Sequence, residues 1–96
     1  MKVKYFDWNR EKSVLLKKKR GVSFEELVNV IIEGGLLDII DHPNKEKFSN
    51  QQVFVIEFDD YIYLIPFVED KEKYFLKTLY PSRKMTKIYL IERRKK

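Results

Sequence analysis

Basic and tyrosine side chains are concentrated toward the carboxyl end of the chain, in a pattern that suits chemistry on RNA. The residues in question are Lys73, Tyr74, Lys77, Tyr80, Arg83, Lys84, Lys87 and Tyr89. Lysine and arginine neutralise phosphate groups, and aromatic rings stack on unpaired bases. The sequence therefore predicts a nucleic-acid interface. We expect its cations to be Lys73, Lys84 and Lys87, together with Lys18 and Arg20 from an earlier basic run.

The same region could cleave RNA without a metal ion. Attack of a ribose 2′-hydroxyl on the adjacent phosphate needs a proton acceptor, a group that stabilises the added negative charge, and a proton donor for the leaving oxygen. Arg83 suits the charge-stabilising role because a guanidinium matches phosphate oxygens bidentately. Lys77 and Tyr80 can serve as acid or base if their pKa values are shifted. These three are the candidate catalytic residues.

Structural roles compete with these functional ones. Lys84 and Lys87 fit a solvated helix face, and Tyr80 and Tyr89 fit packing positions with a polar tip. His42, the only histidine, lies in an acidic stretch and favours a surface position over a role as general base. The alternative hypothesis is therefore a non-catalytic module that binds RNA or a partner protein through the same surface.

Composition excludes several classes of protein. The chain has 96 residues, of which 44% are hydrophobic, and a net charge of +5, which fits one small basic domain over residues 1–96. Without cysteine and with one histidine, no Cys-ligated zinc or His-based metal site is expected. No glycine-rich phosphate loop, HExxH or GxSxG motif occurs, so we expect no cofactor and no metal. Without a long apolar run or a signal-peptide pattern, we expect a cytoplasmic protein that makes no membrane contact.

Charge is segregated along the sequence. Residues 1–20 carry eight basic and two acidic side chains, net +6, and residues 71–96 carry ten basic and two acidic, net +8. The middle, residues 21–70, carries two basic and eleven acidic side chains, net −9. If the basic ends meet in space, they form one patch suited to a polyanion. The same polarity could support self-association.

Two helices are predicted near the amino terminus. Asp7 or Asn9 can cap a helix over residues 10–19, which ends in a run of cations that favours the helix dipole. Ser23 and Glu26 have the spacing of a capping box, and apolar residues then recur at helical spacing to about residue 32. These local signals predict a helical hairpin.

Runs rich in Ile, Val, Phe and Tyr predict the sheet. The expected strands are residues 36–41, 52–58, 61–69 and 73–80, preceded by a short strand or extended segment at 4–6. Pro66 argues for a bulge or an edge position in the third of these runs. On a regular last strand, Lys73, Phe75 and Lys77 share one face, whereas Tyr74, Thr78 and Tyr80 share the other.

The final element is a helix capped by Ser82 and running from Arg83 to about Ile91, followed by a basic tail at residues 93–96 that is expected to fray. The predicted fold class is therefore α+β. It combines two N-terminal helices, a small and mainly antiparallel sheet of about four strands, and a C-terminal helix.

Three motifs together carry a family resemblance. They are FDWNREK at residues 6–12, RGVSFEE at residues 20–26, and PSRKMT at residues 81–86 followed by Tyr89. They resemble the patterns F-x-W-D-x-x-K, H-G-V-S-F-E-E and S-A-R-[KR]-A of the BrnT toxins of bacterial type II toxin–antitoxin systems. The resemblance spans nearly the whole chain, is good in the helices and is poor in the sheet.

The resemblance implies a RelE-like fold, a metal-independent endoribonuclease activity that stops translation, and a cognate antitoxin, usually a ribbon-helix-helix DNA-binding protein, in a higher-order complex. Arg83 matches the arginine of the S-A-R motif, and Lys77 falls near the basic residue of the preceding strand. Arg20 stands where the family has histidine. Residues 52–69 contain no Lys or Arg, whereas the family has an arginine in its middle strands.

Overall fold

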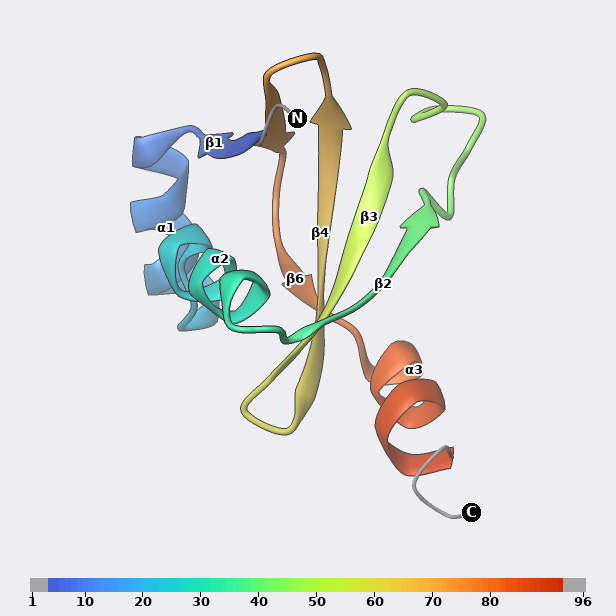
Figure 1. Ribbon diagram of the computed structural model, residues 1–96. Coiled ribbons are helices and arrows are strands. Elements are labelled where there is room, and N and C mark those ends of the chain that lie inside the picture. The colour runs from blue at the N-terminus through green and yellow to red at the C-terminus, as the bar shows by residue number, and fades with distance from the viewer. Residues whose placement is uncertain (1–3, 93–96) are drawn as a thin grey trace.

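A mixed sheet with helices on both faces is the framework of the computed structural model, which describes residues 4–92 (Figure 1). The strands are β1 (Tyr5–Trp8), β2 (Leu36–Asp41), β3 (Gln52–Phe58), β4 (Tyr61–Glu69), β5 (Lys73–Leu76) and β6 (Tyr80–Pro81). The helices are α1 (Arg10–Arg20), α2 (Phe24–Ile32) and α3 (Arg83–Thr86), the last continuing as the π-helix η1 (Lys87–Glu92). The predicted α+β class and its helix order are confirmed.

The strand order is β1-β5-β4-β3-β2, and β6 pairs with β4. All pairs are antiparallel except β1 and β5, which are parallel. The sheet thus has six strands rather than the expected four, because the short segment before α1 joins one edge and the last strand is divided in two.

Side-chain caps fix the ends of α1 and α2. The Asn9 side chain accepts a hydrogen bond from the Lys12 backbone N–H at 3.0 Å, so Asn9 is the cap of α1. Gly21 ends α1 with a φ of 79°, a left-handed conformation that glycine adopts without a steric cost. Ser23 and Glu26 form the predicted capping box, with both of its hydrogen bonds present.

Ser13 joins α1 to the start of α2 from inside the protein. Its hydroxyl accepts a hydrogen bond from the Phe24 N–H at 3.1 Å and donates one to the Glu25 carboxylate at 2.6 Å. The side chain is only 2% exposed. The Ser13 hydroxyl lowers the pKa of Glu25, and the Lys17 ammonium, 2.7 Å from Glu26, lowers the pKa of that carboxyl.

We expect Ser13→Ala to lower the free energy of unfolding by about 1–2 kcal/mol, because it leaves the Phe24 N–H without its partner. Glu25 and Glu26 have folded-state pKa values below the ordinary value of 4.5. Their ionised carboxylates therefore stabilise the fold fully above that pH, and this stabilisation is lost as pH falls through the lowered pKa values. Urea unfolding near neutrality and at acid pH should therefore show a smaller acid-induced loss in Ser13→Ala. Equal stability of the two proteins at both pH values would contradict this.

Two hydrophobic clusters lie on opposite faces of the sheet. The larger one lies between the sheet and α1 and α2, where Phe54 and Phe67 stack at 3.9 Å between ring centroids. Phe6 and Tyr74 pack against this pair, mainly edge to face. The smaller cluster lies under α3 and η1 and consists of Val53, Val55, Ile62, Leu64 and Leu90 with Tyr80, Met85, Tyr89 and Ile40 around them.

The expected continuous strand over residues 73–80 is wrong. Phe67 pairs with Leu76 and Leu64 pairs with Tyr80, so residues 77–79 lie opposite residues 65–66. This extra residue is a bulge, and it faces buried Pro66, which has no N–H to donate to a regular ladder. The Pro66 carbonyl still accepts a hydrogen bond from the Lys77 N–H at 2.8 Å.

The bulge reverses which face the following side chains occupy, because strand residues alternate between faces. Tyr74 packs in the cluster beside α1 and α2, whereas Tyr80 packs in the cluster beneath α3. The expectation that Tyr74 and Tyr80 share a face is therefore wrong. Lys73 and Lys77 both lie against the ring of Phe75, since their ammonium groups are 5.7 and 5.5 Å from its centre.

The C-terminal helix begins at the cap predicted from sequence. The Ser82 hydroxyl accepts a hydrogen bond from the Met85 N–H, and Thr86 accepts one from the Ile62 N–H at 2.8 Å, which ties α3 to β4. Helical structure continues through η1 to Glu92, and the predicted basic tail lies outside the described residues. Among helices in the described range 4–92, none has the length and apolar character needed to cross a membrane.

Candidate nucleic-acid interface

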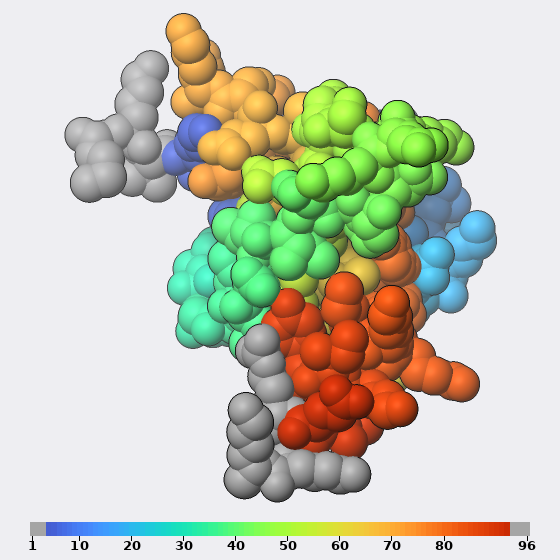
Figure 2. Space-filling model, turned by 90° about the vertical axis from the view of Figure 1, so that its right-hand side faces the viewer, coloured from blue at the N-terminus to red at the C-terminus, as the bar shows by residue number. Residues whose placement is uncertain are grey.

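A pocket of about 250 Å³ opens at the bulge between β5 and β6. Its lining comes from α1, the β2–β3 loop, β4 and the chain after β5, and consists of Lys12, His42, Phe48, Gln51, Pro66, Lys77, Thr78 and Tyr80. On the face shown in Figure 2, blue α1, the green β2–β3 segment and the orange chain after β5 adjoin one another. We refer to this pocket as the bulge pocket.

The bulge brings together two of the three candidate catalytic residues. On a regular strand Lys77 and Tyr80 would point to opposite faces, but the extra residue places both at the bulge pocket. Burial raises the pKa of the Tyr80 phenol above its ordinary value of 10.0. Near neutral pH Tyr80 is therefore a protonated hydrogen-bond donor and cannot act as the base.

His42 is half-buried in this pocket, although the sequence favoured a surface position. Its Nδ1 accepts a hydrogen bond from the Asn44 N–H at 3.0 Å, so the neutral ring carries its proton on Nε2. The ring lies 4.4 Å from that of Phe48, between centroids, at an angle of 37°. The two tilted rings give the pocket an aromatic side with one N–H donor.

Electrostatically, the bulge pocket is positive and rich in donors. Lys12 and Lys77 contribute ammonium groups, and none of the lining residues is an aspartate or glutamate. Lys12 belongs to the first basic segment of the sequence and Lys77 to the last, so the two segments meet here. The parallel pairing of β1 with β5 also joins them, but β1 and α3 lie far apart at opposite ends of the molecule, so within residues 4–92 the cations of the two segments do not form one patch (Figure 1).

The other predicted cations lie elsewhere. Arg83 is exposed in the first turn of α3 and does not line the bulge pocket, and Lys84 and Lys87 are exposed on the same helical segment. Lys18 lines a separate pocket beside α1, and Arg20 is exposed at the end of that helix.

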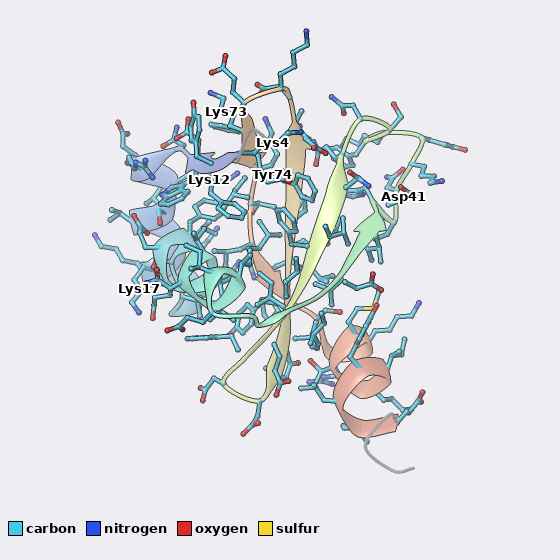
Figure 3. The ribbon with its side chains drawn as sticks, in the orientation of Figure 1. Lys4, Lys12, Lys17, Asp41, Lys73 and Tyr74 are labelled. Carbon is cyan, nitrogen blue, oxygen red and sulfur yellow. The ribbon has the colours of Figure 1, made fainter. Side chains whose placement is uncertain are left out.

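Lys73 is held within the sheet by an ion pair. Its ammonium lies 3.4 Å from an Asp7 carboxylate oxygen on neighbouring β1, and this hydrogen bond raises the pKa of Lys73. Figure 3 shows Lys73 beside β1 with Lys4 and Tyr74, whereas Lys12 and Lys17 project from α1. Pairing with Asp7 makes Lys73 a structural cation more than a free phosphate ligand.

Sequence reasoning did not predict that Lys12 and His42 line the bulge pocket. Lys12 is the last residue of the FDWNREK motif, but the motif gave it no role in a site, and only the packing of α1 beside the bulge brings it to the bulge pocket. The sequence around His42 gave no sign that the Asn44 N–H bonds to its ring or that the ring contacts Phe48.

Within residues 4–92, no group of three or more His, Cys, Asp or Glu side chains could hold a metal ion. Fold and pocket together define a small α+β protein with a cationic, donor-lined pocket at a sheet bulge. Comparison of the chain with protein-family models, with curated proteins and with solved structures found no match.

Proposed function

We propose that this chain is the toxin of a type II toxin–antitoxin system and that it acts on RNA in the cytoplasm through the bulge pocket. The observation that carries the proposal is the meeting of Lys12, Lys77, Tyr80 and the His42–Phe48 pair in one pocket. The resemblance of the two helical motifs and the Arg83 motif to BrnT toxins supports the same function. A cognate ribbon-helix-helix antitoxin would then neutralise it, in a complex that can be of higher order.

RNA backbone and base both find partners in such a pocket. The Lys12 and Lys77 ammonium groups suit phosphate oxygens, and His42 Nε2–H and the Tyr80 hydroxyl add two neutral donors. The half-buried ring of Phe48 offers a stacking surface for an unpaired base. A base held in a duplex is not free to stack on Phe48, so the proposed substrate is single-stranded RNA.

Cleavage of RNA by 2′-hydroxyl attack would give the pocket residues the following roles. In this proposal Lys77 and Lys12 stabilise the added negative charge, and Tyr80, which is protonated at neutral pH, donates a proton to the leaving oxygen. The 2′-hydroxyl proton then goes to His42, whose Nε2 is free to accept it only after Nδ1 gives up the hydrogen bond from the Asn44 N–H and takes the ring proton. Arg83 joins the site if bound RNA extends from the bulge pocket to α3.

A second candidate function is a non-catalytic RNA-binding module on the same fold. The specific observation that favours it is that the pocket presents donors and cations without a carboxylate, while His42 Nδ1 is already occupied. Such a site binds phosphate well and activates a hydroxyl poorly. This candidate predicts salt-sensitive RNA binding with no cleavage.

Induction of the chain in a bacterial host should arrest growth and generate new RNA ends. We expect Lys77→Ala, a change at an exposed side chain, to abolish both effects while the protein stays folded. Lys71→Ala, an exposed lysine of the β4–β5 turn outside the pocket lining, is the matched control and should remain toxic. Arg83→Ala in the same assay tests whether the RNA path reaches α3.

Normal growth with folded wild-type protein would contradict the toxin proposal. If that protein still bound RNA with a Lys77-dependent affinity, the non-catalytic module would be the correct function. Toxicity retained by Lys77→Ala would instead remove the bulge pocket from the mechanism.

A further inference from the structure

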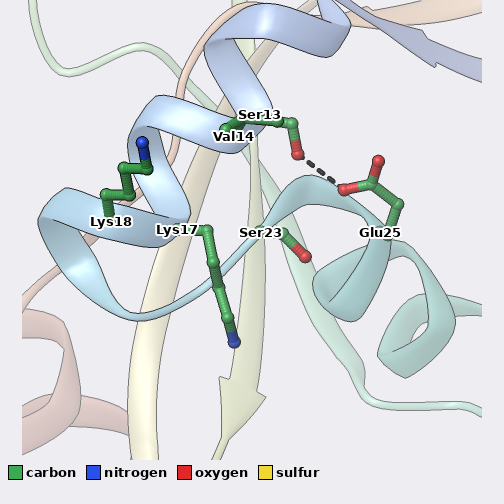
Figure 4. Close-up of a pocket in the computed structure, with 6 residues that line it drawn as sticks. All are labelled: Ser13, Val14, Lys17, Lys18, Ser23 and Glu25. Carbon is green, nitrogen blue, oxygen red and sulfur yellow. Dashed lines mark hydrogen bonds between the residues drawn. The ribbon is translucent and has the colours of Figure 1, made fainter.

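A second pocket, of about 280 Å³, lies on the other flank of α1 (Figure 4). Its lining consists of Ser13, Val14, Lys17, Lys18, Ser23 and Glu25. Most of its polar groups are already engaged, since Ser13 bonds to Glu25, and both Ser23 and Lys17 bond to Glu26. What it offers a ligand is therefore an apolar wall, made by Val14 and the aliphatic stems of the two lysines.

Two aliphatic side chains are exposed in the middle of α1: Val14, which lines this pocket, and its chain neighbour Leu15. Val14 is 58% and Leu15 is 62% exposed, whereas Leu16 beside them is buried at 6%. In a helix Val14 and Leu15 are each followed one turn later by a lysine, Lys18 and Lys19, on the same face. We call Val14, Leu15, Lys18 and Lys19 the outer face of α1.

The outer face is positively charged as well as apolar. Lys18, Lys19 and Arg20 are exposed, and the described part of the chain gives none of them an ion-pair partner. Apolar area flanked by unpaired cations fits a protein segment that is apolar on one side and acidic on the other. Phosphate would satisfy the lysines but would leave both aliphatic side chains in water.

The outer face also borders the bulge pocket. Lys12, which lines that pocket, lies one turn before Leu15 on α1. A ligand that covers Leu15 and reaches one turn toward the start of the helix therefore meets Lys12. Occupation of the outer face and access of RNA to the bulge pocket should exclude each other.

We propose that the outer face of α1 binds an acidic amphipathic helix of a partner protein and that the bound helix blocks RNA. Apolar residues of that helix cover Val14 and Leu15, and its carboxylates pair with Lys18, Lys19 and Lys12. The blocking role rests on the proposed function of the bulge pocket, whereas the docking itself does not.

The test uses a synthetic helical peptide of about 15 residues with leucines at helical spacing and glutamates elsewhere. Added to the ¹⁵N-labelled chain, it should shift the amide signals of α1 and displace a short single-stranded RNA. We expect the double variant Val14→Ser, Leu15→Ser to bind the peptide about tenfold more weakly and RNA with unchanged affinity. Ile91→Ser, which removes an apolar side chain 50% exposed on η1, is the matched control and should bind the peptide normally.

Several outcomes would overturn the docking proposal. The proposal is wrong if the peptide shifts map away from α1, if no shift occurs at about 1 mM peptide, or if the double variant binds the peptide as tightly as the unmodified chain. Concentration-dependent shifts of α1 without peptide would assign the face to a second copy of the chain. Larger shifts of the outer-face residues Val14, Leu15, Lys18 and Lys19 with RNA than with peptide would make that face a nucleic-acid surface. Peptide binding on α1 in a chain that binds no RNA would keep the docking site and contradict only the function proposed for the bulge pocket.

Discussion

Replacing Lys12 and Lys77 together by alanine should weaken binding of a short single-stranded RNA by about 100-fold. Both side chains line the bulge pocket. In the proposed complex each makes one phosphate contact, which the variant lacks. A phosphate contact contributes about 0.7 to the slope of log affinity against log salt for single strands, so that slope should fall by about 1.4. Both lysines are exposed, so the fold should not change.

Fluorescence anisotropy of a labelled oligonucleotide at several salt concentrations measures both quantities. The matched control replaces Lys84 and Lys87, which are exposed on the C-terminal helix and lie outside the pocket lining. It removes the same charge and should change affinity much less. An equal or larger loss in the control would place the RNA along α3 and η1 instead of in the bulge pocket.

The second large effect is on stability. Phe54→Ala should lower the free energy of unfolding by about 3–5 kcal/mol, because it leaves a cavity in the larger cluster. Phe54 is 2% exposed, stacks on Phe67 at an interplanar angle of 9° and makes an edge contact with Tyr74. Domains of this size have a total stability of about 5–15 kcal/mol, so the variant should be close to unfolding at ordinary temperature.

Urea unfolding followed by far-ultraviolet circular dichroism gives the comparison. Ile39→Ala is the matched control, because Ile39 lies opposite Phe54 on β2 and is 45% exposed. It should cost less than about 1 kcal/mol. A loss for Phe54→Ala no greater than that for the control would contradict the assignment of the larger cluster as the principal core.

Elements specified by adjacent residues could be predicted from the sequence. The capping box of Ser23 and Glu26 and the cap at Ser82 bond as their spacing indicated. The β3–β4 hairpin turns at Asp59 and Asp60, whose φ values of 56° and 60° match the two-residue turn that suits twisted strands. In each case the bonds that decide the geometry join residues a few positions apart.

Features that depend on distant residues could not be predicted in the same way. The parallel pairing of Tyr5 with Lys73 joins segments near opposite ends of the sequence, and no local sequence pattern predicts this pairing. Pro66 did indicate a bulge, but not that the extra residue would fall on the partner strand. That placement brings Lys77 and Tyr80 to the same pocket, and His42 joins them through the path of the β2–β3 loop.

Binding of RNA in the bulge pocket is tested most directly by a residue-resolved titration. Amide signals of the ¹⁵N-labelled chain should be followed as a short single-stranded RNA is added. We expect the largest shifts at the pocket residues Lys12, His42, Phe48, Gln51, Lys77, Thr78 and Tyr80. Shifts confined to α3 and η1, or no shift at about 1 mM RNA, would contradict it.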